Sequence, residues 1–194
     1  SHEMFKIMNK DTVVDIGAHV GYFTLYAANI AKKGKIISYE PSKKSFFSLE
    51  KNLEINNFSN IKLENVAVSK IHGKAVLHVD DDDGISNSLY DLNKKSKVYE
   101  VETVTLEEIL SKNELHEIDF LKIDCEGAEY EILMSASSSD LNKIKKISVE
   151  IHEKLVPYSK EEVIEKLKNN GFHVKLQTHI SGVRMELPLL LAWK

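Results

Sequence analysis

Residues 12–21 read Thr12-Val13-Val14-Asp15-Ile16-Gly17-Ala18-His19-Val20-Gly21, and they set the architecture expected for the rest of the chain. The apolar run at their start predicts a buried β-strand, and the glycines after it predict a tight turn that leads into a helix. A strand–turn–helix unit of this kind builds nucleotide-cofactor sites. Glycines let the backbone approach the ligand, and the helix N-terminus offers unpaired N–H groups.

Asp15 indicates which kind of cofactor the turn would bind. A dinucleotide-binding turn places a pyrophosphate at the helix N-terminus, where a neighbouring carboxylate would repel the phosphates. A carboxylate at the strand end instead suits a cofactor with a cationic amino-acid end, such as S-adenosylmethionine (SAM). The turn therefore favours a methyltransferase over a nicotinamide-dependent oxidoreductase. A non-catalytic binding protein of the same fold is a further alternative, because a fold alone does not confer activity.

Composition is that of an ordinary soluble protein, with 194 residues, 42% hydrophobic and 29% charged. This length predicts a single α/β domain over residues 1–194, of which residues 1–3 are interpreted as an expression remnant. The net charge of −4 argues against a nucleic-acid partner. The single cysteine, Cys125, excludes an internal disulfide and fits a reducing compartment. No apolar run approaches the roughly 20 residues of a membrane span, so we expect a cytoplasmic protein without a membrane partner.

Apolar runs alternate with helical patterns, which predicts a mostly parallel sheet with helices on both faces. The expected strands of this sheet cover residues 12–16, 35–39, 61–68, 118–123, 144–151, 172–177 and 187–193. The expected helices cover residues 21–32, 42–56, 105–110, 128–136 and 160–170. After the third strand, residues 75–79 and 98–105 alternate in hydrophobicity around a turn cluster at 80–84. This pattern predicts an antiparallel β-hairpin insertion in place of a crossover helix.

Glu40 ends the second expected strand, 25 positions after Asp15. An acidic residue at this point falls beside the ribose of an adenosine cofactor, where its carboxylate can accept from both hydroxyls. Dinucleotide-binding proteins also place an acidic residue beside the ribose in this way. Glu40 therefore predicts an adenosine cofactor without choosing between the two classes.

A second acidic segment reads Asp124-Cys125-Glu126-Gly127-Ala128-Glu129 and follows the buried strand that ends at Ile123. Ligands of open α/β sheets bind at this carboxyl edge of the strands. An alternative is that Glu126 and Glu129 cap the following helix and interact favourably with its dipole, which suits Glu129 better than Asp124.

Glu150 and His152 lie two positions apart at the end of the strand expected over residues 144–151, so their side chains share one face. We interpret His152 as a general base oriented by Glu150, with Asp124 shaping the acceptor side and no metal. Alternatively, Glu150 and His152 supply two ligands to a divalent metal and are joined by Asp124 or Glu126. The competing mechanism has a metal bridged by Asp124, Glu126 and Glu150.

Taken in order, these blocks resemble the FkbM-type SAM-dependent methyltransferases. The resemblance rests on residues 14–21 (VDIGAHVG), 39–41 (YEP), 65–69 (NVAVS), 103–106 (TVTL), 120–129 (FLKIDCEGAE) and 149–152 (VEIH). It implies a class I, Rossmann-like three-layer fold with a seven-stranded sheet whose last strand is antiparallel. It also implies O-methylation of a hydroxyl on a small molecule or a saccharide.

The resemblance assigns roles by position along the chain. Asp15, Gly17 and Gly21 would line the methionine end of SAM, and Glu40 would hold the ribose. The remaining assignments place Val66 and Ala67 beside the adenine and Asp124 and Glu126 near the sulfonium. His19 departs from the Asn or Gly that is common in this turn, and we expect it to remain part of the cofactor site because the backbone does most of the binding.

Overall fold

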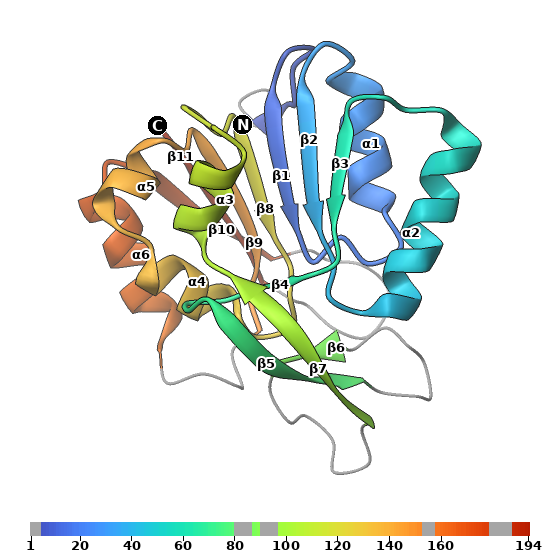
Figure 1. Cartoon of the computed structure of the whole chain (residues 1–194). Coiled ribbons are helices and arrows are strands. Elements are labelled where there is room, and N and C mark those ends of the chain that lie inside the picture. Colours follow the sequence, from blue (N-terminus) through green and yellow to red (C-terminus); the bar gives the residue numbers. More distant parts are fainter. Residues whose placement is uncertain (1–4, 80–86, 90–96, 153–157, 179–187) are drawn as a thin grey trace.

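The computed structural model describes residues 5–79, 87–89, 97–152, 158–178 and 188–194 (Figure 1). Within them, one seven-stranded sheet has the order β10-β11-β9-β8-β1-β2-β3. Its strands are β1 (Thr12–Ile16), β2 (Lys35–Tyr39), β3 (Ile61–Glu64), β8 (Phe120–Ile123), β9 (Lys146–Glu150), β10 (His173–Thr178) and β11 (Pro188–Trp193). The neighbours from β3 to β9 pair in parallel, whereas β11 is antiparallel to both β9 and β10. The expected sheet with an antiparallel last strand is confirmed.

Helices cover both faces of this sheet, because successive strand residues point to opposite sides. Val13 packs with Ala27 and Ala28 of α1 in one apolar cluster, whereas Val14 packs with Ile132 of α4 in the other. The helices are α1 (Tyr22–Ile30), α2 (Lys43–Asn56), α3 (Leu106–Lys112), α4 (Glu129–Ser135), α5 (Ser138–Asn142) and α6 (Lys160–Asn169). Among these, α5 was not expected from the sequence.

The segment 61–68 was expected to be one strand, and that prediction was wrong. β3 ends at Glu64, and β4 (Ala67–Val68) belongs to a second sheet. Between them, the Asn65 side-chain amide donates to the carbonyls of Glu40 and Pro41, which turns the chain away from β2. This turn brings β4 beneath the carboxyl edge of the large sheet (Figure 1).

The second sheet contains the predicted insertion. Its order is β4-β7-β5-β6, with β5 (Gly73–Val79), β6 (Asn87–Ser88) and β7 (Lys97–Val104). β7 pairs antiparallel with the whole length of β5, as the alternating pattern predicted, and β6 pairs with the other side of β5. The turns of a hairpin would fall at residues 80–86 and 90–96, outside the described residues, so the hairpin itself stays a prediction.

Other expected boundaries differ from the structure by a few residues. β8 and β9 each begin two residues later than predicted, and an isolated bridge between Ile118 and Ile144 precedes them. Ser42 caps the N-terminus of α2, its hydroxyl accepting from the Ser45 N–H at 3.4 Å. In the part of the chain that the structure describes, no helix has the length and hydrophobicity needed to cross a membrane.

Candidate active site

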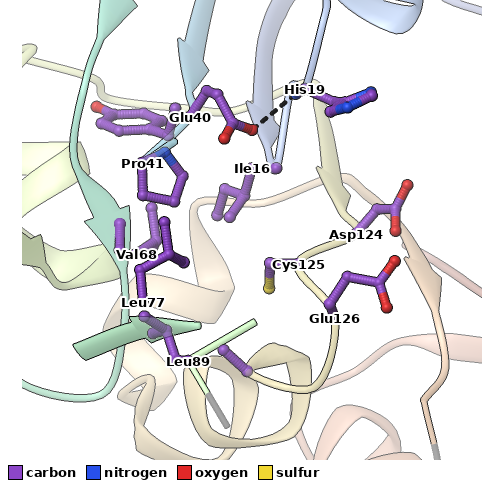
Figure 2. A pocket seen from close by; sticks show the side chains of 14 residues that line it. Ile16, His19, Glu40, Pro41, Val68, Leu77, Leu89, Asp124, Cys125 and Glu126 are labelled. Atoms are coloured by element: carbon purple, nitrogen blue, oxygen red, sulfur yellow. Dashed lines mark hydrogen bonds between the residues drawn. The ribbon is translucent and has the colours of Figure 1, made fainter. Parts of the chain in front are cut away.

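A cavity opens at the carboxyl edge of β1, β2 and β8, where parallel strands present their ends together. One side is apolar and the opposite side is acidic, with Asp124 and Glu126 projecting there (Figure 2). The residues that line it are Ile16, Gly17, His19, Tyr39, Glu40, Pro41, Ala67, Val68, Leu77, Leu89, Asp124, Cys125, Glu126 and Ala128. The cavity therefore lies where the sequence placed the cofactor site.

The turn after β1 requires glycine at residue 17. Its φ of 78° lies in the left-handed region, and a Cβ there would lie 1.7 Å from the carbonyl oxygen of Asp124. The main chains at the ends of β1 and β8 consequently approach each other closely at this point. His19 also has a positive φ, 51°, a conformation that Gly and Asn adopt more readily than histidine. This backbone requirement gives a physical reason for the Asn or Gly common at that position.

Glu40 is buried at the top of the cavity and is held by the main chain. One carboxylate oxygen accepts from the His19 N–H at 2.8 Å (Figure 2). The other accepts from the Ser42 N–H, also at 2.8 Å. Burial raises the pKa of this carboxyl, and the two backbone hydrogen bonds oppose the shift. Each carboxylate oxygen has a second lone pair, so the group can still accept from a ligand hydroxyl.

Asp15 is fully buried and is not among the residues that line the cavity. Its Oδ2 accepts from the Thr24 hydroxyl at 2.7 Å, and its Oδ1 lies 3.3 Å from the Nζ of Lys122. The role predicted for Asp15 at the methionine end stays a prediction. If the prediction holds, Asp15 acts from beneath the turn through charge rather than through direct contact.

Lys122 is a residue that the sequence reasoning missed. Strand register pairs it with Asp15, and its Nζ also lies 3.3 Å from Asp124 Oδ2 and donates to the Gly17 carbonyl at 3.3 Å. Desolvation lowers the pKa of this lysine, but Asp15 and Asp124 outweigh that effect and raise it above the ordinary value. Lys122 is therefore a cation. A lysine within the apolar run Phe120–Ile123 was the available signal.

Glu129, the first residue of α4, organises the loop after β8. Its side chain is fully buried, and its two oxygens accept from the N–H groups of Cys125 at 3.0 Å and Gly127 at 2.8 Å. It also forms a 2.9 Å hydrogen bond with Nδ1 of His152. The expectation that Glu150 orients His152 was wrong, because this bond assigns the orienting role to Glu129.

His152 lies among carboxylates, with its Nε2 3.4 Å from a Glu126 oxygen. Desolvation lowers the pKa of this imidazole, but the hydrogen bond and charge of Glu129, followed by Glu126 and Asp124, raise it to about 9. Burial raises the pKa values of Glu126 and Glu150; the charges of Asp124 and Glu129 add to this shift, and His152 opposes it. At neutral pH, His152 is therefore mainly an imidazolium.

A divalent ion could also be held at this end of the cavity. Asp124, Glu150 and His152 each offer a ligand atom, and these atoms all lie within 4.8 Å of one another. Oxygen and imidazole donors suit several divalent metals. Of the metal alternatives that the sequence offered, this set corresponds to Glu150 and His152 joined by Asp124, and Glu126 is not part of it.

Not all of the other predicted cofactor residues line this cavity. Gly17, His19, Ala67 and Glu126 line the cavity beside Glu40 and Asp124. Val66 instead lines a second cavity, which shares Tyr39 with the first. Gly21 packs against Leu49, where a Cβ would lie 2.3 Å from the leucine Cδ1. The apolar residues Val68, Leu77 and Leu89 were not predicted, because they come from the second sheet and the segment beside it.

Residues 15–174 match the model of the methyltransferase FkbM domain. The chain belongs to this family. Its curated relatives include Methyltransferase 1 of Beauveria bassiana, which is 22% identical over 85% of this chain and 73% of that protein. Methyltransferase sdnD of Sordaria araneosa is 26% identical over 78% of this chain and 70% of that protein. Family membership makes the protein a SAM-dependent methyltransferase, in agreement with the interpretation of the turn.

Solved structures show the same class I fold. Methyltransferase FkbM from Methylobacillus flagellatus has a TM-score of 0.61 at 16% identity, over 97% of this chain and 45% of that one. A methyltransferase from Streptococcus mutans in complex with S-adenosylhomocysteine (SAH) has a TM-score of 0.54 at 12% identity, over 98% and 93% of the two chains. At these identities the likeness is one of fold.

Proposed function

We propose that this protein transfers the methyl group of SAM to a hydroxyl oxygen of a small molecule or a saccharide. The observation that carries the proposal is the imidazole–carboxylate cluster of His152, Glu129, Glu126 and Glu150 at the acidic end of the cavity. A hydroxyl must lose its proton when it is methylated, and this cluster can accept one.

The two ends of the cavity fit the two ends of the cofactor. Glu40 supplies acceptors for ribose hydroxyls, and the apolar side with Ala67 and Val68 suits a planar base. The methionine end then extends toward Gly17 and Asp124. SAM supplies a methyl group already activated by the sulfonium, so the protein's tasks are alignment and proton removal.

We assign proton removal to His152. Glu129 holds Nδ1, which leaves Nε2 as the nitrogen that can take a proton from the acceptor. A base with a pKa of about 9 is mainly protonated at pH 7, so only the minor neutral form reacts. Below pH 9, kcat/KM should rise about tenfold for each pH unit.

The charge of the site supports a neutral or hydroxyl-rich acceptor. Asp124, Glu126, Glu129 and Glu150 surround His152, so carboxylates outnumber cations there and would repel a phosphate. With the net charge of −4, this arrangement supports a substrate other than nucleic acid. We place the reaction in the cytoplasm, in keeping with the single cysteine.

The test is methyl transfer from labelled SAM to a panel of saccharides, phenols, amines and RNA. We expect label on a hydroxyl, and we expect His152→Ala to abolish it while SAH affinity stays within twofold. His116→Ala, which changes an exposed histidine, is the matched control and should keep full activity. Label on amines or RNA, or full turnover by His152→Ala, would overturn the proposal.

A chelator separates the metal mechanism from the base mechanism. Activity that survives EDTA and follows the pH rise described above supports His152 as the base. Loss of activity in EDTA with recovery on adding Mg²⁺ or Mn²⁺ would assign Asp124, Glu150 and His152 to a metal instead.

A further inference from the structure

The ammonium group of Lys122 contacts two carboxylates and a backbone carbonyl at the edge of the cavity. Its ammonium lies 3.3 Å from a carboxylate oxygen of Asp15 and 3.3 Å from one of Asp124, and it donates to the Gly17 carbonyl at 3.3 Å. The side chain is 19% exposed and its Nζ lies 5.7 Å from the centre of the Phe23 ring. The ammonium is therefore held against the turn and the acidic end of the cavity.

The two carboxylates and the ammonium carry a combined charge of −1. Without Lys122, the same place would carry −2 with little water to screen it, since Asp15 is fully buried. The cofactor changes charge at this end of the cavity: SAM carries a sulfonium, whereas SAH carries a neutral thioether. A more negative site would bind SAM more tightly without stabilising the transition state equally, because the sulfonium charge disappears during transfer.

We infer that Lys122 balances the charges of Asp15 and Asp124 and thereby sets how strongly the site prefers cationic SAM over neutral SAH. The inference rests on the SAM-binding function proposed above and on the methionine end lying toward Asp124. It makes Lys122 a residue that tunes cofactor and product binding by charge, in addition to joining β1 and β8.

Calorimetric titration of SAM and SAH into the wild type and Lys122→Met tests this role. We expect the ratio Kd(SAH)/Kd(SAM) to rise about fivefold in Lys122→Met, because a nearby positive charge has been removed. Lys122→Arg keeps the cation and should leave the ratio within twofold of the wild type. A lysine that only joins strands would change both affinities by the same factor, so an unchanged ratio in Lys122→Met overturns the inference.

Lys122→Met leaves the Asp15 carboxylate buried without its cation, which destabilises the fold. A second pair of variants avoids this loss of stability. Asp15→Asn is compared with Asp15→Asn/Lys122→Met, which differs from it only at the lysine. The ratio should again rise about fivefold; equal ratios overturn the inference even if Lys122→Met alone does not fold.

Lys145→Met is the matched control, because Lys145 also bridges two acids, Asp119 and Glu117, but neither acid lines the cavity. Lys122, by contrast, contacts Asp124 and Gly17, which do line it. It should leave both affinities unchanged. A wild type that binds neither SAM nor SAH would overturn the cofactor assignment together with this inference. Wild-type binding with no change of ratio in the Lys122 variants overturns the inference alone.

Discussion

The two ends of the cavity hold buried carboxylates in different ways. At the β2 end, Glu40 receives two backbone N–H groups, from His19 and Ser42. At the β8–β9 end, Glu129 also receives two backbone N–H groups but adds the ring of His152, and Asp124 is paired with Lys122. The first end depends on the main-chain path of one turn, whereas the second depends on charged side chains from β8, from α4 and from the segments that follow β8 and β9.

This difference separates the tasks of the two ends. Main-chain donors have fixed charge at every pH, so the β2 end is suited to constant binding of one cofactor. Side-chain ions respond to pH and to a bound ligand, which suits an end where a proton is transferred. The two ends meet at Gly17, whose backbone contacts the Asp124 carbonyl.

Gly17→Ala should disturb both ends and give the largest effect. A Cβ 1.7 Å from the Asp124 carbonyl oxygen forces β1 and β8 apart, and the positive φ adds strain. We expect a loss of about 4 kcal/mol in unfolding free energy, measured by urea denaturation.

Gly171→Ala is the matched control, because φ is +84° and no atom lies within 4 Å of the added Cβ. It should cost only about 1 kcal/mol. Equal losses in the two variants would mean that the close approach of β1 and β8 does not constrain residue 17.

Glu129→Ala should destabilise only the β8–β9 end of the cavity. It removes the acceptor from two backbone N–H groups and from His152 inside a buried loop, which should cost about 3 kcal/mol of unfolding free energy. Glu131→Ala, on the same helix, loses only an ion pair with the half-exposed Lys70 and should cost less than about 1 kcal/mol. SAH affinity at the β2 end should change less than catalysis does.

The pH dependence of stability should also come from the β8–β9 end. The pKa of His152 is raised from 6.5 to about 9, so its stabilising contribution is complete below pH 6.5 and is lost as pH rises through 9. We expect the difference in unfolding free energy between wild type and His152→Gln to shrink by about 2 kcal/mol between pH 6 and pH 10. A difference that stays constant over this range would show that His152 is not held as a cation.

The sequence predicted the β2 end better than the β8–β9 end for a physical reason. The turn at residues 17–21, the strand before it and the placement of Glu40 depend on local backbone preferences, which short motifs record. The bonds of Lys122 to Gly17 and of His152 to Glu129 join residues 105 and 23 positions apart, and they exist only once the strands are paired. Strand spacing alone could not choose Glu129 over Glu150 as the partner of His152.

The same reasoning explains the boundary missed after β3. Residues 61–68 read IKLENVAV, and the β-branched and apolar residues on both sides of Asn65 favoured a single strand. The break comes from Asn65, whose amide finds carbonyls at the end of β2 that are fixed by the sheet. Apolar patterning therefore predicted that a strand forms here, whereas tertiary hydrogen bonds decided where it ends.

Glu40→Gln should change the β2 end alone and give the smallest effect. The amide oxygen can accept one of the two backbone N–H groups, but the NH₂ group then faces the other donor and one ribose acceptor is lost. We expect SAH affinity to fall about tenfold by calorimetry, which is about 1.4 kcal/mol, with kcat at saturating SAM unchanged. Glu64→Gln, which changes the acid at the end of neighbouring β3, should bind SAH like the wild type. If Glu40→Gln also binds SAH like the wild type, the ribose assignment is wrong, and the main-chain anchoring of Glu40 serves only to close the turn.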